Sequence, residues 1–183
     1  MTDLLYETDR MKVRSLLPED QHLLVKWLSD PKVLQYYEGR DNPFNLQKVE
    51  RSFYYQEKGV VKCLVEFEGK KIGYIQFYKV NSVTSEITDY SEEENVYGID
   101  QFIGETDYWN KGIGTMLISS MVDYLMEQKQ AGRIIMDPHV SNTRALRCYE
   151  KCGFKKVRIL PKHEWHEGEY RDCWLIEYTK SSI

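Results

Sequence analysis

The segment from Val96 to Met121 constrains the fold of this chain more than any other stretch. It begins with an apolar run over Tyr97–Ile103, continues through a polar turn, and reaches two glycines, Gly112 and Gly114, just before apolar residues at helical spacing. A strand, a glycine-rich turn and a helix in this order leave free backbone N–H groups at the start of the helix. Because a helix start of this kind binds anions well, the segment predicts an anion site.

The composition is that of an ordinary globular protein. The 183 residues suit one core, so we expect a single domain over residues 1–183. Hydrophobic residues make up 42% of the chain and charged residues 30%, which is typical of this class. The 14 tyrosines and 4 tryptophans can build a core or line a pocket for a polar ligand with apolar faces. The formal net charge of −4 argues against nucleic acid as a partner.

The first residues and the cysteines indicate a cytoplasmic location. The N-terminal stretch has neither a basic lead nor a long apolar run, so we expect no signal peptide and no membrane partner. The four cysteines, Cys63, Cys148, Cys152 and Cys173, form no Cys-x-x-Cys pair, and we interpret them as reduced thiols. A monomer and a homodimer both remain open.

The pattern of apolar and turn residues predicts the element order β-α-α-β-β-β-α-β-α-β-β. We expect strands over Met11–Leu16, Val60–Phe67, Lys71–Tyr78, Tyr97–Ile103, Arg133–Met136, Lys155–Leu160 and Arg171–Tyr178, the last two joined by a histidine-containing loop. We expect helices from Pro18 to Asp30, over Asn45–Lys58, from Lys111 or Gly112 to about Gln128, and over Thr143–Lys151. This order predicts an α/β (α+β) fold with a mixed, mostly antiparallel sheet flanked by helices.

The turn over Lys111–Gly114 has the chemistry that a pyrophosphate needs. Successive backbone donors and the helix dipole can hold the anion, glycines remove the Cβ atoms that would keep it away, and Lys111 adds a cation. Two better-known phosphate motifs do not fit, since Leu117 stands where a dinucleotide fingerprint needs its third glycine and no P-loop pattern is present. A plain strand-to-helix turn remains the alternative.

A second segment decides between these interpretations. It reads Asp137-Pro-His-Val-Ser-Asn-Thr-Arg-Ala-Leu-Arg-Cys-Tyr-Glu-Lys-Cys-Gly-Phe154. Together with the glycine turn it resembles the GCN5-related N-acetyltransferase (GNAT) superfamily, whose members carry Arg/Gln-x-x-Gly-x-Gly/Ala and, about thirty residues later, Asn…Ala…Tyr-Glu-Lys-x-Gly-Phe. Trp109 stands at the usual Arg/Gln position, so no phosphate contact is assigned to that side chain.

The resemblance implies acetyl-CoA as the acetyl donor. The implied cofactor-binding residues are Phe102 and Ile103 through their backbone, Asn110, Lys111, Gly112, Ile113, Gly114 and Thr115 in the turn, and Asn142 and Tyr149. Tyr149 would sit near the thioester sulfur, where a phenol can give a proton to a departing thiolate. The alternative for Tyr149 is an aromatic side chain packed one helical turn from Ala145.

An acidic stretch precedes the glycine turn. From Val80 to Asn110 there is no lysine or arginine, and the stretch holds eight acids: Glu86, Asp89, Glu92, Glu93, Glu94, Asp100, Glu105 and Asp107. An acidic wall beside the acetyl donor would attract a polycationic amine. A solvated acidic loop is the alternative.

Asp100 differs from the other acids because it lies within a predicted strand. A buried carboxylate there needs a partner, and an incoming ammonium group would supply one. The carboxylate could then accept the amine proton directly or through water. Exposure on the outer face of the strand is the alternative.

Further residues narrow the resemblance to the aminoglycoside 6′-N-acetyltransferases, and most closely to the acetyltransferase half of the bifunctional acetyltransferase–phosphotransferase resistance enzymes. They are Trp27-Leu-x-Asp, Tyr36-Tyr37, Gly73-Tyr-Ile-Gln76, Tyr97-Gly-Ile-Asp-Gln101, Asp137-Pro-His and His163-Glu-x-His-Glu-Gly. The resemblance implies acetyl transfer to the 6′-amine of kanamycin- or tobramycin-like antibiotics, and hence antibiotic resistance. Asp100 is then the implied base, Asp137 contacts the drug, and Tyr37, Gln76 and Tyr97 line the acceptor site.

Other functions were weighed against this one. A zinc site near His163, His166 and Cys173 stays open, although the spacing is not His-Glu-x-x-His, and we expect no metal. No triad-like pattern supports an acyl-cysteine route, so direct attack in a ternary complex is preferred. A peptide or ribosomal-protein N-terminal acetyltransferase and a non-catalytic CoA-binding sensor remain the alternatives.

Overall fold

The computed structural model describes residues 3–55, 57–81 and 85–180. Its strands are β1 (Leu4–Glu7), β2 (Met11–Ser15), β3 (Val60–Phe67), β4 (Lys70–Lys79), β5 (Val96–Ile103), β6 (Arg133–Met136), β7 (Lys155–His166) and β8 (Glu169–Thr179). Its α-helices are α1 (Gln21–Trp27), α2 (Pro31–Leu34), α3 (Leu46–Val49), α4 (Ile113–Gln128) and α5 (Thr143–Lys151). Short 3-10 turns cover Pro18–Asp20, Glu92–Glu94 and Thr106–Tyr108, and a π-helical turn over Glu50–Tyr54 continues α3.

The strands form one mixed sheet in the order β1-β2-β3-β4-β5-β6-β8-β7. Strand β2 pairs antiparallel with β1 and β3, and β6 pairs antiparallel with β8. Strands β5 and β6 run parallel, with Val96 opposite Arg133 and Gly98 opposite Ile135. The predicted mixed, mostly antiparallel sheet with helices is confirmed.

The chain folds into two compact units. The first comprises Met1–Gln76, Gln101–Ile113 and His166–Glu169, and the second comprises Phe77–Asp100, Gly114–Trp165 and Tyr170–Ile183. Strands β4 and β5 contribute residues to both units. The single domain expected from the sequence therefore stays a prediction, and each unit is described by itself.

The core of the first unit is built from α1, α2, α3 and an aromatic cluster on the strands. Trp27, Leu28 and Phe53 pack with Tyr74 and Phe102 among its buried residues. Burial of aromatic and aliphatic side chains of this size supplies most of the free energy that holds such a unit together.

Gly104 follows β5 within the first unit. A Cβ atom there would lie 2.1 Å from Cγ of Trp27, which is 1% exposed. Glycine at this position lets the backbone pass directly over the indole ring.

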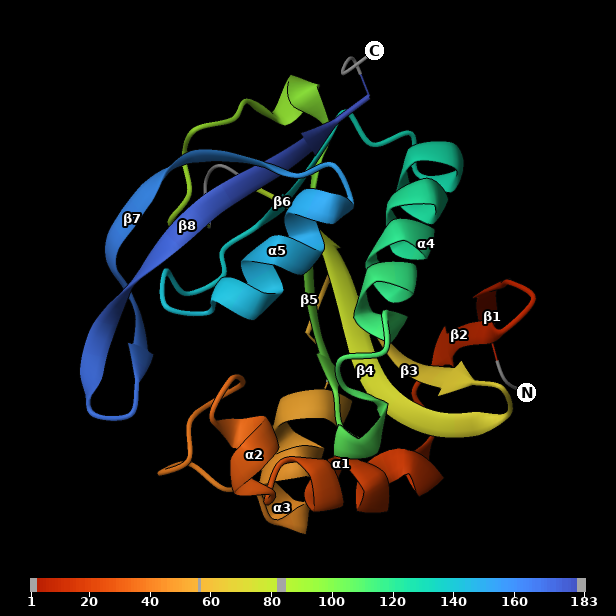
Figure 1. Ribbon diagram of the computed structural model, residues 1–183. Coiled ribbons are helices and arrows are strands. Elements are labelled where there is room, and N and C mark those ends of the chain that lie inside the picture. The colour runs from red at the N-terminus through yellow and green to blue at the C-terminus, as the bar shows by residue number, and fades with distance from the viewer. Residues whose placement is uncertain (1–2, 56, 82–84, 181–183) are drawn as a thin grey trace. The chain divides into compact units, whose positions relative to one another are not determined.

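In the second unit α4 and α5 lie side by side (Figure 1), joined by contacts between small polar side chains and thiols. Thr115 Oγ1 lies 3.4 Å from Cys148 Sγ, and Ser119 Oγ lies 3.5 Å from Cys152 Sγ. The N-terminal turn of α4 is thereby held against α5, as helix packing through small residues allows.

Most predicted elements are confirmed, and the differences have local causes. The predicted histidine loop is wrong, because β7 runs through Pro161 to His166 and only Glu167 and Gly168 turn the chain. Pro161 suggested a break, yet β7 is the last strand of the sheet order, where a missing N–H is tolerated.

Two further differences lie near the N-terminus. Strand β1 has no counterpart among the predicted elements, because none of its four residues is buried and they carry little periodic signal. Pro31 was read as the end of a helix, but it begins α2, with Asp30 capping through a 3.0 Å bond from the Lys32 N–H. The helix expected over Asn45–Lys58 begins as predicted, capped by Asn45, and ends at Tyr54.

Within the described part of the chain, no helix combines the length and apolar character that crossing a bilayer requires.

Candidate functional site

Two aspartates in the second unit lie at the same level of adjacent parallel strands, Asp100 within β5 and Asp137 directly after the end of β6. Gly98 on β5 lies opposite Ile135 on β6, and Asp100 and Asp137 each follow two residues later. Both carboxylates are half-buried. Because the two strands run parallel with Gly98 opposite Ile135, the register brings to one level two acids that are far apart in the sequence.

The negative charges of both aspartates affect the pKa of Tyr78. Burial raises the pKa of Tyr78, and the negative charges of Asp100 and Asp137 raise it further. The ring packs over Gly98, where a Cβ atom would lie 2.5 Å from Cζ of Tyr78. Tyr78 therefore remains a neutral phenol that is able to donate a hydrogen bond.

His163 adds a titratable group to this edge. Its Nε2 lies 2.8 Å from Oδ2 of Asp137, and its Nδ1 lies 3.7 Å from Glu86. The hydrogen bond to Asp137 raises the pKa of His163, burial lowers it, and the charge of Asp137 raises it again, with a net increase. The imidazole thus holds the Asp137 carboxylate in place and, when protonated, partly offsets its negative charge.

Replacing His163 with Gln should remove a pH-dependent part of the stability. Since the folded pKa of His163 is raised, its contribution is complete below the ordinary histidine pKa of about 6.5 and is lost as the pH rises through the folded value. We expect a loss of about 1–2 kcal/mol in the free energy of unfolding at pH 5.5 that shrinks by pH 8.5. Urea unfolding at both pH values measures it.

The exposed His22 provides the matched control for this experiment. His22→Gln should change the free energy of unfolding by less than about 0.5 kcal/mol at either pH. An effect of His163→Gln that is equal at pH 5.5 and 8.5 would contradict the role given to the ion pair.

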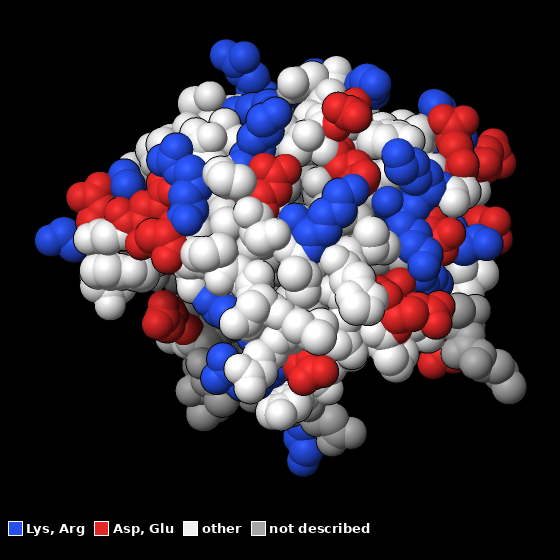
Figure 2. Space-filling model, turned by 90° about the horizontal axis from the view of Figure 1, so that it is seen from below, with Lys and Arg blue, Asp and Glu red and all other residues white. Residues whose placement is uncertain are grey.

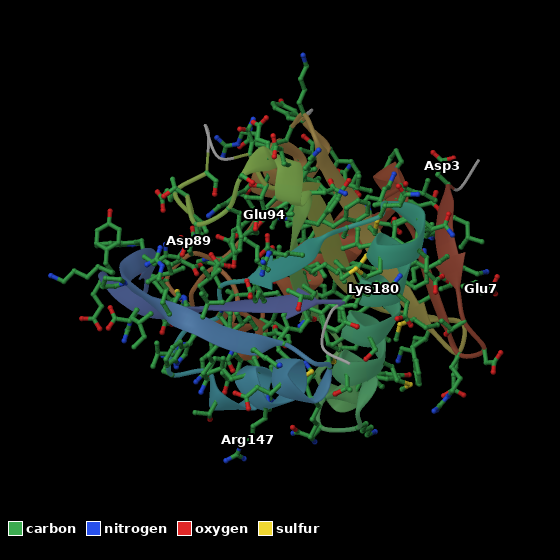
Figure 3. The ribbon with its side chains drawn as sticks, turned by 90° about the horizontal axis from the view of Figure 1, so that it is seen from above. Asp3, Glu7, Asp89, Glu94, Arg147 and Lys180 are labelled. Atoms are coloured by element: carbon green, nitrogen blue, oxygen red, sulfur yellow. The ribbon has the colours of Figure 1, made fainter. Side chains whose placement is uncertain are left out.

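The acidic stretch is less negative in the folded chain than its sequence suggests. Asp89 pairs with Arg158 at 2.7 Å and Glu94 with Arg133 at 3.2 Å, two acids that Figure 3 labels on the segment before β5. Glu105, in the first unit, lies 2.9 Å from Lys26. Basic and acidic side chains also alternate over the face drawn in Figure 2. Three of the eight acids are thus neutralised by bases from elsewhere in the chain.

The first unit contains the end of β5. Phe102 is buried there, with its ring 4.6 Å from that of Tyr37 and 5.6 Å from that of Tyr74, measured between centroids. The Tyr74 hydroxyl donates a 2.5 Å hydrogen bond to Oε1 of Gln76. Two predicted acceptor-site residues, Tyr37 and Gln76, therefore belong to one aromatic cluster around Phe102.

Trp109 stands at the Arg/Gln position of the family motif and makes contacts within the protein. Its Nε1 donates a 2.8 Å hydrogen bond to the carbonyl oxygen of Ile103, and its ring meets Tyr36 edge-on at 5.9 Å. The side chain thus fastens the end of β5 to the turn that follows. The departure from the family pattern serves the fold of the first unit rather than an anion.

The turn before α4 is open on the side where a ligand would approach. Gly112 has a φ of +77°, and a Cβ atom added there would meet nothing within 4 Å. Asn110, with a φ of +61°, and Lys111 are exposed beside it. Positive φ values explain the glycine and the asparagine, because other side chains rarely adopt this conformation.

Helix α5 carries the other predicted cofactor residues, all in the second unit. Asn142 caps the helix, its Oδ1 accepting a 3.3 Å hydrogen bond from the Ala145 N–H. Tyr149 is 7% exposed, and its ring lies 6.3 Å from that of Phe154. The cap is confirmed, and the cofactor contacts of both residues stay predictions.

The remaining predicted residues lie close to those already described. Tyr97 on β5 packs its half-buried ring 6.3 Å from Phe77 in the second unit. Ile113 is buried at the start of α4. A Cβ atom added at Gly114 would lie 3.7 Å from Sγ of Cys148.

The four thiols of the chain differ in their surroundings. Burial raises the pKa of Cys63 and of Cys173 to about 12. A hydrogen bond with Cys152 lowers the pKa of Cys148, whose other close neighbour is the Thr115 hydroxyl. Direct transfer without an acyl-cysteine remains the preferred interpretation.

Sequence reasoning missed Tyr78 and the pairing of His163 with Asp137. Tyr78 closes a predicted strand, where alternation alone does not distinguish a site residue from a core residue. The sequence relates His163 to a family motif and to a zinc site with His166 and Cys173, whereas the fold places it against Asp137, 26 residues away in the chain. The one indication in the sequence that His163 belongs to the site is the motif His163-Glu-x-His-Glu-Gly.

Comparison with known proteins agrees with the fold and identifies the family. A family model described as "Acetyltransferase (GNAT) domain" matches residues 17–161. An aminoglycoside N(6')-acetyltransferase type 1 from Klebsiella pneumoniae is 28% identical over 151 residues, covering 81% of this chain and 75% of the relative. A kanamycin resistance protein from Rhizobium radiobacter is 43% identical over 68 residues, covering 36% of this chain and 63% of the relative.

Solved structures that resemble this chain include an aminoglycoside acetyltransferase. The crystal structure of aminoglycoside acetyltransferase AAC(6')-Ib in complex with coenzyme A and kanamycin superimposes with a TM-score of 0.75 at 26% identity. The alignment covers 93% of this chain and 95% of that one.

Proposed function

The chain belongs to the acetyltransferase (GNAT) domain family, and we propose that it transfers acetyl from acetyl-CoA to the 6′-amine of kanamycin- or tobramycin-type aminoglycosides. The observation that carries the proposal is the pair of half-buried carboxylates at one level of the parallel strands, Asp100 within β5 and Asp137 directly after β6. Aminoglycosides are polycationic, and two half-buried carboxylates at one strand edge suit ammonium groups. Relatives of this chain are named for the same reaction.

The chain's own residues fit the donor. In the first unit, the open backbone from Asn110 to Gly112 and the start of α4 suit a pyrophosphate. The backbone of Phe102 and Ile103 would bind the pantetheine arm. In the second unit, Gly114, Thr115 and Asn142 would complete the binding of acetyl-CoA, which supplies a thioester-activated acetyl group.

Two residues of the second unit would carry the proton transfers. Asp100 accepts a proton from the 6′-ammonium group, directly or through one water, and leaves a neutral amine that attacks the acetyl carbonyl carbon. The new C–N bond forms as the C–S bond breaks, and the attacking nitrogen gives its second proton to solvent, which leaves a neutral amide. Tyr149 gives its phenolic proton to the departing thiolate, and solvent returns a proton to the phenolate. The products are the 6′-N-acetyl drug and free CoA.

Four further residues would contact the acceptor in this proposal. Asp137, held by His163, and Tyr97 would contact the drug from the second unit. Tyr37 and Gln76 would do so from the first unit. In a cell, transfer from acetyl-CoA would take place in the cytoplasm and would inactivate the antibiotic before it reached its target.

A thiol-release assay with acetyl-CoA tests this function. We expect turnover of kanamycin A, none of an analogue carrying a hydroxyl in place of the 6′-amine, and at least about 100-fold lower kcat/KM for a basic peptide with a free N-terminus. Faster turnover of the peptide would favour a protein N-terminal acetyltransferase. CoA binding without turnover of any amine would favour a sensor, and either result would overturn the proposal.

A further inference from the structure

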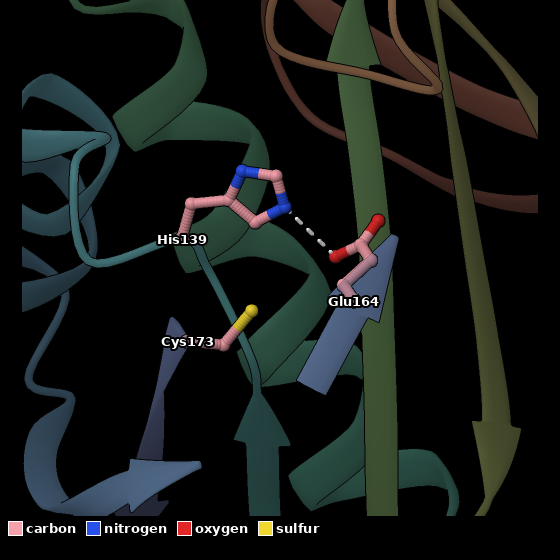
Figure 4. A group of neighbouring side chains, drawn as sticks. All are labelled: His139, Glu164 and Cys173. Carbon is pink, nitrogen blue, oxygen red and sulfur yellow. Dashed lines mark hydrogen bonds and ion pairs between the residues drawn. The ribbon is translucent and has the colours of Figure 1, made fainter. Parts of the chain in front are cut away.

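A cluster of metal-binding side chains in the second unit is not used by the proposed reaction. The ligand atoms of His139, Glu164 and Cys173 all lie within 4.8 Å of one another. Figure 4 shows the imidazole, the carboxylate and the thiol turned toward a common point. They come from three segments: the chain after β6, strand β7 and strand β8.

The backbone holds two of these residues directly opposite each other. His139 and Cys173 form an isolated antiparallel bridge. On either side of it, the Val140 N–H donates to the Asp172 carbonyl at 3.0 Å and the Trp174 N–H donates to the Pro138 carbonyl at 2.8 Å. The two ligand atoms are therefore brought together by the fold and not by a chance arrangement of flexible side chains.

Glu164 closes the third side. Its Oε2 lies 3.1 Å from Nε2 of His139, a spacing expected between two ligands of one small ion. Its side chain is 49% exposed, whereas that of His139 is 15% exposed and Cys173 is fully buried. An ion would thus enter from the solvent side, past the carboxylate, and reach the sulfur last.

We propose that His139, Glu164 and Cys173 form a zinc-binding site, with a water molecule as the fourth ligand. One nitrogen, one oxygen and one sulfur are ligands that Zn²⁺ accepts in tetrahedral geometry. Calcium and magnesium prefer oxygen ligands alone, so the thiol selects against them. Binding would convert the Cys173 thiol to a thiolate and release its proton to the buffer.

The site would stabilise the second unit rather than take part in acetyl transfer. An ion bound there would cross-link the segment after β6 to β7 and β8. Asp137, which is proposed to contact the drug, lies only two residues before His139. The same cross-link would therefore also limit the movement of Asp137. Since the ion binds the folded state, zinc should raise the melting temperature.

Titration of the reduced, metal-free protein with Co²⁺ tests the proposal. We expect a thiolate-to-cobalt charge-transfer absorption that saturates at one ion per chain and disappears on addition of Zn²⁺. Cys173→Ala should abolish the absorption, and His139→Gln and Glu164→Gln should each weaken zinc binding at least about tenfold in equilibrium dialysis. Near-ultraviolet circular dichroism checks that each variant is folded. If Cys173→Ala does not fold, the zinc affinities of the two Gln variants test the site.

The neighbouring thiols on α5 provide the matched control. Cys148 and Cys152, one helical turn apart, could themselves bind a thiophilic ion. Cys148→Ser and Cys152→Ser should leave cobalt absorption and zinc affinity unchanged. If these variants lose binding while His139→Gln and Glu164→Gln keep it, or if the unaltered protein binds no cobalt, the proposed site is wrong.

Discussion

Replacing Asp100 with Asn should lower kcat for kanamycin acetylation by about 100- to 10,000-fold, the range expected when a general base is removed. The amide has nearly the shape of the carboxylate but cannot accept the ammonium proton. Because the neutral amine becomes more abundant as the pH rises, the deficit should shrink between pH 6 and pH 9. Steady-state thiol release over this range measures both the deficit and its pH dependence.

The division of the effect between kcat and KM identifies the role of Asp100. A loss confined to KM would mean that the carboxylate only binds the ammonium group, whereas a loss in kcat means that it removes the proton. Asp107→Asn is the matched control, since Asp107 is an exposed acid of the same stretch. We expect that control to stay within about twofold of the unaltered enzyme. Full activity of Asp100→Asn would refute the assignment.

The elements that the sequence predicts well are those whose residues lie near each other in the chain. The helix over Ile113–Gln128 follows directly from apolar residues at helical spacing, and the Asn142 cap follows from a single residue type. The parallel pairing that brings Asp100 to the level of Asp137 is not a local property. Family resemblance, and not spacing, connected these two residues before the fold was known.

Charge partners illustrate the same limit. The acidic stretch contains no base of its own, so its sequence indicates a strong negative field. Arg133 and Arg158, which neutralise Glu94 and Asp89, come from strands 39 and 69 residues away. Counting charges along the chain overestimates the field wherever tertiary ion pairs form.

Asp20 illustrates the same limit at the start of the predicted helix. An acid two residues after a proline in the first turn of a helix is usually an exposed partner of the helix dipole. Here Asp20 is fully buried and forms two hydrogen bonds with the guanidinium of Arg14, at 2.8 and 3.1 Å. It also accepts a 2.8 Å bond from the Leu17 N–H. Burial opposes its charge, but the bonds from Arg14 and Leu17 outweigh burial and lower the pKa of Asp20.

Replacing Asp20 with Ala should therefore be among the most destabilising single changes in the first unit. The substitution leaves the Arg14 guanidinium, whose side chain is 5% exposed, without its buried partner, and we expect a loss of about 3–5 kcal/mol in the free energy of unfolding at pH 7. Since the pKa of Asp20 is lowered, its contribution exists above the ordinary aspartate pKa and disappears as the pH falls through the folded value. Urea unfolding at pH 7 and at acid pH measures the difference.

Two comparison variants separate the buried ion pair from a general effect on the helix start. Glu19→Ala removes the exposed neighbouring acid and should cost no more than about 1 kcal/mol. The double variant Arg14→Met, Asp20→Leu replaces both buried charges with apolar side chains. It should be more stable than Asp20→Ala alone, because the charge that loses its partner is then Glu66, whose side chain is 20% exposed, and not Arg14, whose side chain is 5% exposed. Equal losses for Glu19→Ala and Asp20→Ala would mean that the helix dipole, and not the partner of Arg14, is the source of the effect.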